Sequence, residues 1–137
     1  MIQGRRLAFW SCLSVSCIVL LSGCGGGDSG PPRFHVSGMV NYKGAPIPKG
    51  TIAFEPDPDA NNKGPSTLIP IENGTYSSKT AKVKGTVGGP MVVRINGGDG
   101  KEAGTLKNGT PLFKEYSEKV DLPKSETTKD FEVPAKK

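Results

Sequence analysis

Three places in the sequence carry side chains whose type and spacing could do chemistry. Cys24 offers a thiol, which is a nucleophile once it is deprotonated. His35 is the only histidine and therefore the first candidate for proton transfer near neutral pH. The loop at residues 57–61 reads Asp-Pro-Asp-Ala-Asn and presents side-chain oxygens of the kind that calcium prefers.

Cys24 stands at the end of an export-signal pattern. Arg5 and Arg6 form a short basic region, and residues 7–21 form an apolar run that is shorter than the ~20 residues of a spanning helix. The run ends Leu-Ser-Gly-Cys at residues 21–24, which resembles the lipobox of bacterial lipoproteins. That resemblance implies a diacylglycerol on the Cys24 thiol, cleavage just before this residue, and acylation of the new amino terminus, for example by palmitate.

These boundaries divide the chain into three parts. Residues 1–23 are predicted to be the signal peptide, residues 24–32 the lipidated cysteine and a flexible tether rich in glycine, and residues 33–137 one domain. The partner implied for Cys24 is a membrane. In the lipoprotein group, glycine instead of aspartate after the cysteine directs the product outward, so we expect the outer membrane of the cell envelope.

Composition limits what the domain can be. Two of the three cysteines lie in the signal, so the mature domain is predicted to have no internal disulfide. Removing Arg5 and Arg6 lowers the net charge from +5 to +3. The remaining lysines are dispersed and there is no arginine cluster, which argues against nucleic acid as a partner.

The hydrophobic pattern after residue 33 has a period of two, as expected for strands with one buried face. Such segments cover residues 34–42, 51–55, 67–71, 75–78, 91–96, 119–122 and 128–133, with a weaker strand at 82–87, a break at 97–100 and one helical turn at 111–116. About seven short strands separated by turn residues predict an all-β fold, an antiparallel β-sandwich.

Two motifs resemble those of a known family. Residues 36–54 read V-S-G-M-V, then K-G-A-P-I-P-K-G-T-I-A-F, and residues 73–76 read N-G-T-Y. They are similar to the first hairpin and the D-G-x-Y step of carboxypeptidase-regulatory-like domains. The resemblance implies a transthyretin-like, or more broadly immunoglobulin-like, sandwich in which Gly38, Phe54 and Tyr76 have structural roles.

The residues give little support for catalysis. His35 falls on the polar phase of the first strand, and a single histidine without a second histidine or a free thiol cannot build the usual zinc site. No G-x-S-x-G motif marks a serine nucleophile. Some transthyretin-like proteins are hydrolases with several histidines and a C-terminal Y-R-G-S, both of which this sequence lacks. We therefore predict no catalytic residues, no metal site and no cofactor.

The loop at 57–61 leaves two interpretations open. Asp57, Asp59 and Asn61 match positions one, three and five of a calcium loop, but Asn62 replaces the glycine at six and Leu68 the glutamate at twelve. The loop is either simply solvated or a weak calcium site.

The leading hypothesis is a lipid-anchored, non-enzymatic module with a structural or protein-interaction role in the cell envelope. Its partner would be an unidentified envelope protein or glycan. The alternative is a surface domain that binds a glycan, a peptide or calcium weakly.

Overall fold

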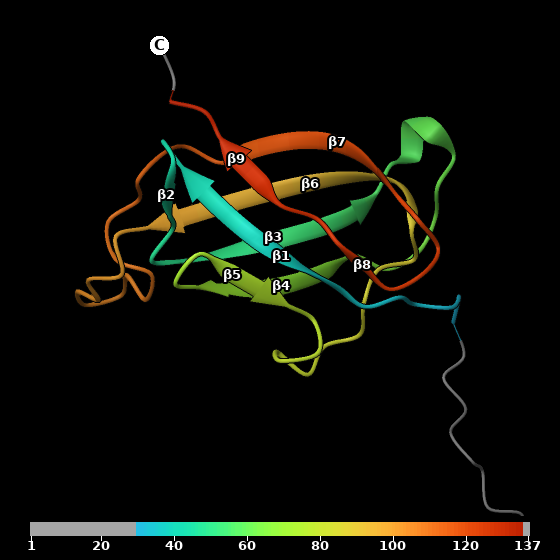
Figure 1. Ribbon diagram of the computed structural model, residues 1–137, viewed down its shortest axis with the longest axis horizontal. Coiled ribbons are helices and arrows are strands. Elements are labelled where there is room, and N and C mark those ends of the chain that lie inside the picture. The colour runs from blue at the N-terminus through green and yellow to red at the C-terminus, as the bar shows by residue number, and fades with distance from the viewer. Residues whose placement is uncertain (1–29, 136–137) are drawn as a thin grey trace, which may run out of the picture.

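The computed structural model describes residues 30–135, and this part of the chain is all-β (Figure 1). Its elements are β1 (Val36–Tyr42), β2 (Ala45–Pro46), β3 (Lys49–Pro56), the short 3₁₀ helix η1 (Pro58–Ala60), β4 (Thr67–Glu72), β5 (Thr75–Ser77), β6 (Gly89–Gly98), β7 (Tyr116–Leu122), β8 (Thr127–Thr128) and β9 (Phe131–Val133). The predicted signal peptide, Cys24 and most of the tether lie outside the described residues. No helix within residues 30–135 is long and apolar enough to cross a bilayer.

One mostly antiparallel sheet joins the strands in the order β2-β1-β5-β4-β3-β6-β7. The two C-terminal strands β8 and β9 pair with β1 in parallel, so the first and last strands of the chain are neighbours. The sheet curls, and Figure 1 shows β1 and β9 crossing in front of β3 and β6. The prediction of an all-β, antiparallel fold is confirmed.

The core lies in the concave side of this sheet and follows from the alternation of the central strands. Every second side chain of β3, β4 and β6 is buried, because these strands lie side by side in register with Ile52 opposite both Ile69 and Ile95. An aromatic cluster closes the core from the other side. Phe54 of β3 contacts Tyr76 of β5 and Phe131 of β9, with ring centroids 5.8 and 6.2 Å apart. Aromatic pairs at these separations add to the stability given by area burial.

The predicted weak strand at residues 82–87 is wrong. The chain turns at Lys82, which has a positive φ of 54°, and only Thr86 pairs with a strand-like partner, Phe34. The carbonyl of Gly85 accepts hydrogen bonds from the side chains of Arg33 and Thr67. Side chains thus take the place of a neighbouring strand, which the hydrophobic pattern could not reveal.

The predicted helical turn at residues 111–116 is also wrong. Pro111 forms an isolated bridge with Gly98, the Leu112 N–H donates to the carbonyl of Gly97 over 3.0 Å, and residues 112–114 bend without forming a helical turn before β7 begins. For the same reason Gly97 and Gly98 continue β6, where a break was predicted. The predicted strand 128–133 is split into β8 and β9.

At this split the C-terminal segment leaves its parallel pairing with β1 for a few residues. A Cβ atom on Gly38 of β1 would overlap the carbonyl of Lys129, so the chain between β8 and β9 passes directly over a glycine. That carbonyl accepts a hydrogen bond from the hydroxyl of Tyr76 at 2.5 Å. Burial raises the pKa of the Tyr76 hydroxyl, which therefore stays a donor. The structural roles expected for Gly38 and Tyr76 follow from this contact.

Candidate functional site

The described chain enters the domain at one end, which we call the entry end: residues 30–36, 62–66, 78–88 and 123–127. Arg33 fixes the chain there. Its Nε donates to the Gly85 carbonyl over 2.7 Å, and its Nη2 donates to Thr67 Oγ1 over 2.6 Å and to the Ser66 carbonyl over 3.3 Å. Phe34 and Thr86 exchange two backbone hydrogen bonds just beyond. The first residues of the domain are therefore held in one direction relative to the sheet.

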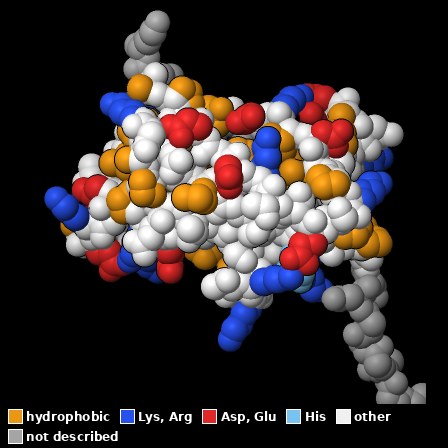
Figure 2. Space-filling view, in the orientation of Figure 1, with side chains coloured by type: hydrophobic (Ala, Val, Ile, Leu, Met, Phe, Trp, Pro, Cys, Tyr) orange, Lys and Arg blue, Asp and Glu red, His pale blue; other side chains and the backbone are white. Residues whose placement is uncertain are grey.

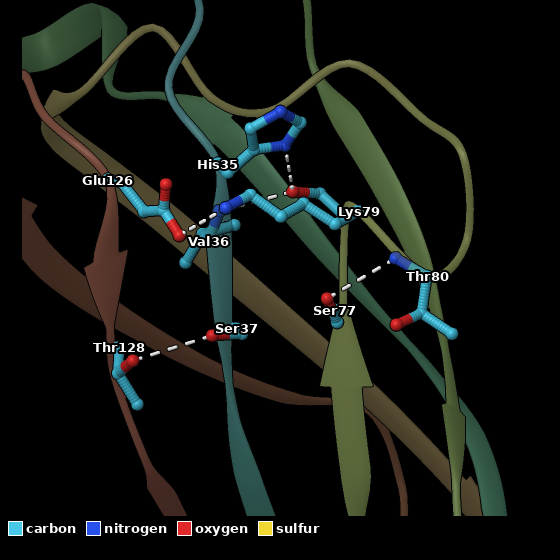
Figure 3. A network of polar contacts seen from close by, with 9 residues as sticks. His35, Val36, Ser37, Ser77, Lys79, Thr80, Glu126 and Thr128 are labelled. Atoms are coloured by element: carbon cyan, nitrogen blue, oxygen red, sulfur yellow. Dashed lines mark hydrogen bonds and ion pairs between the residues drawn. The ribbon is translucent and has the colours of Figure 1, made fainter.

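His35 and a serine that sequence analysis did not single out lie together at this end (Figure 3). His35 Nδ1 lies 3.0 Å from Ser78 Oγ, and the same oxygen accepts the N–H of Val36 at 3.1 Å. The serine hydroxyl has two lone pairs and one proton, so it can accept the Val36 N–H and also bond to Nδ1, in a direction that follows the histidine tautomer. The pairing depends on the β1–β5 register, which the sequence did not give.

This Ser–His pair lacks what a nucleophile requires. Ser78 is fully buried, and its oxygen has no open side from which to reach a substrate carbonyl. His35 is exposed, as its polar phase predicted. The neighbouring carboxylate, Glu126, forms an ion pair with Lys79, which lowers the pKa of that carboxyl (Figure 3). The contacts of Ser78 link β1 to the segment after β5.

The acidic loop at residues 57–61 binds the ammonium group of a lysine side chain. Lys119 Nζ of β7 lies 3.0 Å from Asp57 Oδ2 and 3.0 Å from Asp59 Oδ2. The ammonium lowers the pKa of Asp57, whose other oxygen caps η1 by accepting the Asp59 N–H. Asn62 turns its amide away and donates to the carbonyls of Gly88 and Pro90. Within residues 30–135 no group of three or more His, Cys, Asp or Glu side chains is placed to hold a metal.

The opposite end of the long axis is formed by the turn at residues 43–46 and the loop at 99–115, which we call the loop end (Figure 1). Tyr42 and Phe113 pack there in a tilted arrangement with ring centroids 4.9 Å apart, and Lys43 Nζ lies 5.2 Å from the Tyr42 centroid. Leu106 is 47% exposed. Leu106, Phe113 and Asn96 line an open hollow of about 360 Å³. Sequence reasoning missed this group because its members come from segments about 70 residues apart.

The loop end pairs its charges locally. Asp99 Oδ1 accepts the N–H groups of Lys101 and Thr110 at 3.0 and 2.9 Å. Lys49 forms an exposed ion pair with Glu102, which lowers the pKa of the Glu102 carboxyl. These contacts hold the 99–115 loop together, and neither involves the aromatic pair Tyr42–Phe113.

The chain matches no protein-family model, no curated protein and no solved structure. The family resemblance therefore depends on the motif residues and their places in the fold.

Proposed function

We propose that the protein is a lipid-anchored, non-enzymatic module of the cell envelope, held to the membrane through acyl chains on Cys24. The observation that supports this most is the fixed entry of the chain. Arg33 is bound to three acceptors only nine positions after Cys24. A lipid at that distance would hold the entry end toward the bilayer and the loop end away from it.

We further propose that the domain is a transthyretin-like sandwich of the carboxypeptidase-regulatory-like kind. Two features support this. The sheet curls so that Phe131 of β9 packs on Phe54 of β3 across one core, as two facing layers would. The motif residues Gly38 and Tyr76 also meet at the Lys129 carbonyl, between β8 and β9.

The interaction surface in this proposal is the loop end. Tyr42, Phe113 and Leu106 supply apolar and aromatic surface of the type enriched in binding interfaces. The location we propose is the outer membrane, because Gly25 follows the modified cysteine. An envelope protein is the expected partner.

The alternative function is ligand binding at the same end. A glycan or an extended peptide could lie in the hollow beside Phe113, since sugar and peptide ligands stack on exposed aromatic rings. Calcium has less support than these, because Lys119 already bridges Asp57 and Asp59.

The anchor is tested by labelling cells with a fatty-acid analogue. Wild type should be labelled and Cys24→Ala should not, whereas Cys12→Ala and Cys17→Ala in the signal should be labelled like wild type. Equal labelling of Cys24→Ala would overturn the assignment. Fluorescence gives a second measurement: Trp10 is the only tryptophan and lies in the signal, so purified mature protein should show tyrosine emission alone.

The interaction surface is tested by photocrosslinking in intact cells. A photoreactive residue in place of Leu106 should give a discrete crosslinked protein. The same residue in place of Leu68, an equally apolar side chain that is 60% exposed on β4, should not. The same product from both positions would contradict the assignment to the loop end.

A further inference from the structure

Positive charge gathers at the entry end. Its basic side chains are Arg33, Lys63, Lys79, Lys82, Lys84 and Lys124, and its one acidic side chain is Glu126. In Figure 2 basic side chains and the histidine lie close to the point where the grey trace leaves the domain, with an acidic group beside them. The dispersed lysines of the sequence are thus not evenly distributed on the folded surface.

Contacts in the structure bring these segments together. Asn62 donates to the Gly88 carbonyl, which places Lys63 beside the 85–88 segment. A Cβ atom on Gly88 would lie 3.0 Å from the side chain of Lys124. Arg33 and Lys84 line a common hollow of about 470 Å³ next to His35. Lys79 pairs with Glu126, two positions from Lys124, and the Lys82 N–H donates to the Lys79 carbonyl at 3.1 Å, so these contacts connect the segments that carry the six cations.

Much of this charge has no carboxylate partner. Within residues 30–135, Lys63, Lys82 and Lys124 form no ion pair, and Arg33 donates to two carbonyls and a hydroxyl. Lys79 pairs with Glu126, and Lys84 also has an interaction of its own. At the neighbouring corner, the acidic groups of the 57–59 loop are bound by Lys119. An uncompensated basic surface of this kind suits a partner with many negative charges.

The short link between Cys24 and Arg33 indicates that this partner is the membrane surface. Eight residues separate Cys24 from Arg33, and their covalent reach is at most about 30 Å. A lipid on Cys24 would thus allow these cations to come within a Debye length of the membrane surface, about 8 Å at physiological salt, whereas the loop end lies at the far end of the domain.

We propose that the entry end docks on anionic phospholipid headgroups, so that the domain lies against the bilayer in one orientation. This inference depends on the proposed lipid anchor for its geometry. A basic residue close to an anionic surface contributes about fivefold to binding, or about 1 kcal/mol. Three lysines together should change the ratio of docked to undocked domain by about 100-fold.

The test uses mature lipidated protein in vesicles of neutral phosphatidylcholine, with or without phosphatidylglycerol. The measurement is the rate at which each lysine reacts with an amine reagent. With phosphatidylglycerol, the four lysines Lys63, Lys79, Lys82 and Lys124 of the entry end should be protected at least fivefold, and Lys101, Lys107 and Lys114 of the loop end should not. Protection should disappear in neutral vesicles and at 1 M salt, where the Debye length is about 3 Å.

Two triple variants with the same net charge complete the design. Lys63→Gln/Lys82→Gln/Lys124→Gln should abolish the protection of Lys79, whereas Lys101→Gln/Lys107→Gln/Lys114→Gln should keep it. Equal protection in neutral and anionic vesicles, or none in either, would overturn the docking. Failure of the protein to float with neutral vesicles would instead overturn the lipid anchor, so the two proposals fail separately.

Discussion

The entry end and the loop end hold their backbones with hydrogen bonds of nearly equal length in different surroundings. At the entry end, Ser78 Oγ accepts the Val36 N–H at 3.1 Å, and both residues are buried. At the loop end, Asp99 Oδ1 accepts two N–H groups at 3.0 and 2.9 Å beside solvent-exposed residues. Water can replace an acceptor at the second site and cannot at the first.

Burial, more than bond length, therefore decides what each contact contributes. The entry end should be rigid and intolerant of substitution. The loop end should be tolerant, which suits a surface that adjusts to a partner. Paired substitutions at the two ends test this contrast.

The largest difference should come from Gly85→Ala. A Cβ atom there would overlap the Phe34 carbonyl, which is backbone and cannot move without breaking the Phe34–Thr86 pairing. We expect a loss of about 3 kcal/mol in the free energy of unfolding, measured by urea denaturation. Gly104→Ala at the loop end has open space and should cost only about 1 kcal/mol, for its positive φ of 58°. Equal losses would contradict the contrast.

A smaller difference is expected for Ser78→Ala and Asp99→Ala. Ser78→Ala removes the side-chain acceptor of a buried amide and should cost about 2 kcal/mol, whereas Asp99→Ala leaves amides that water can reach and should cost less than about 1 kcal/mol. Ser77→Ala is the local control, because Ser77 accepts only a long 3.4 Å bond from Thr80. Thermal denaturation gives all three values, and a harmless Ser78→Ala would show that Val36 has another acceptor.

Arg33→Gln should have a moderate effect. The shorter neutral side chain loses the contacts with Gly85 and Thr67, which should cost about 1 kcal/mol and speed hydrogen exchange of the Phe34 and Thr86 amides. Lys49→Gln, which removes the exposed pair with Glu102, should change neither stability nor exchange measurably. Unchanged exchange at Phe34 in Arg33→Gln would show that the entry does not depend on this side chain.

The smallest effect should be on how the free energy of unfolding depends on pH. The folded pKa of Asp57 lies below its usual 3.8 because Lys119 donates to it, so the stabilisation is complete above the unfolded pKa and is lost as the pH falls through the folded value. The free energy of unfolding should decrease less below pH 4 in Asp57→Asn than in wild type. Glu102→Gln should change this decrease less than Asp57→Asn does, since Asp57 is buried and Glu102 is exposed.

The contact of Lys119 with the acidic loop also predicts how the protein responds to calcium. Because Lys119 already bridges Asp57 and Asp59, millimolar calcium should not raise the melting temperature. A clear rise would show that calcium displaces the lysine.

The sequence predicted the strands that alternate strictly, because one buried face is a local property of the pattern. Phe54, Tyr76 and the buried residues of β4 and β6 were identified in this way. It could not predict contacts that depend on register between distant segments. Lys119 reaches Asp59 across 60 positions, and Ser78 reaches His35 across 43. The strand predicted at 82–87 is wrong for a related reason, since the distant side chains of Arg33 and Thr67 both bind the Gly85 carbonyl.

The pairing of β9 with β1 has a consequence for how the chain reaches its destination. Met39 and Asp130, which are in contact across this seam, are 91 residues apart, so β1, the first strand of the described residues, receives this partner about 90 residues later in synthesis. Until residues 131–133 arrive, one edge of β1 is open and Phe54 lacks the ring of Phe131. Domains dominated by such distant contacts fold in milliseconds to seconds. The topology thus delays completion of the native state until β9 has been made, and the export proposed above would take place within that delay.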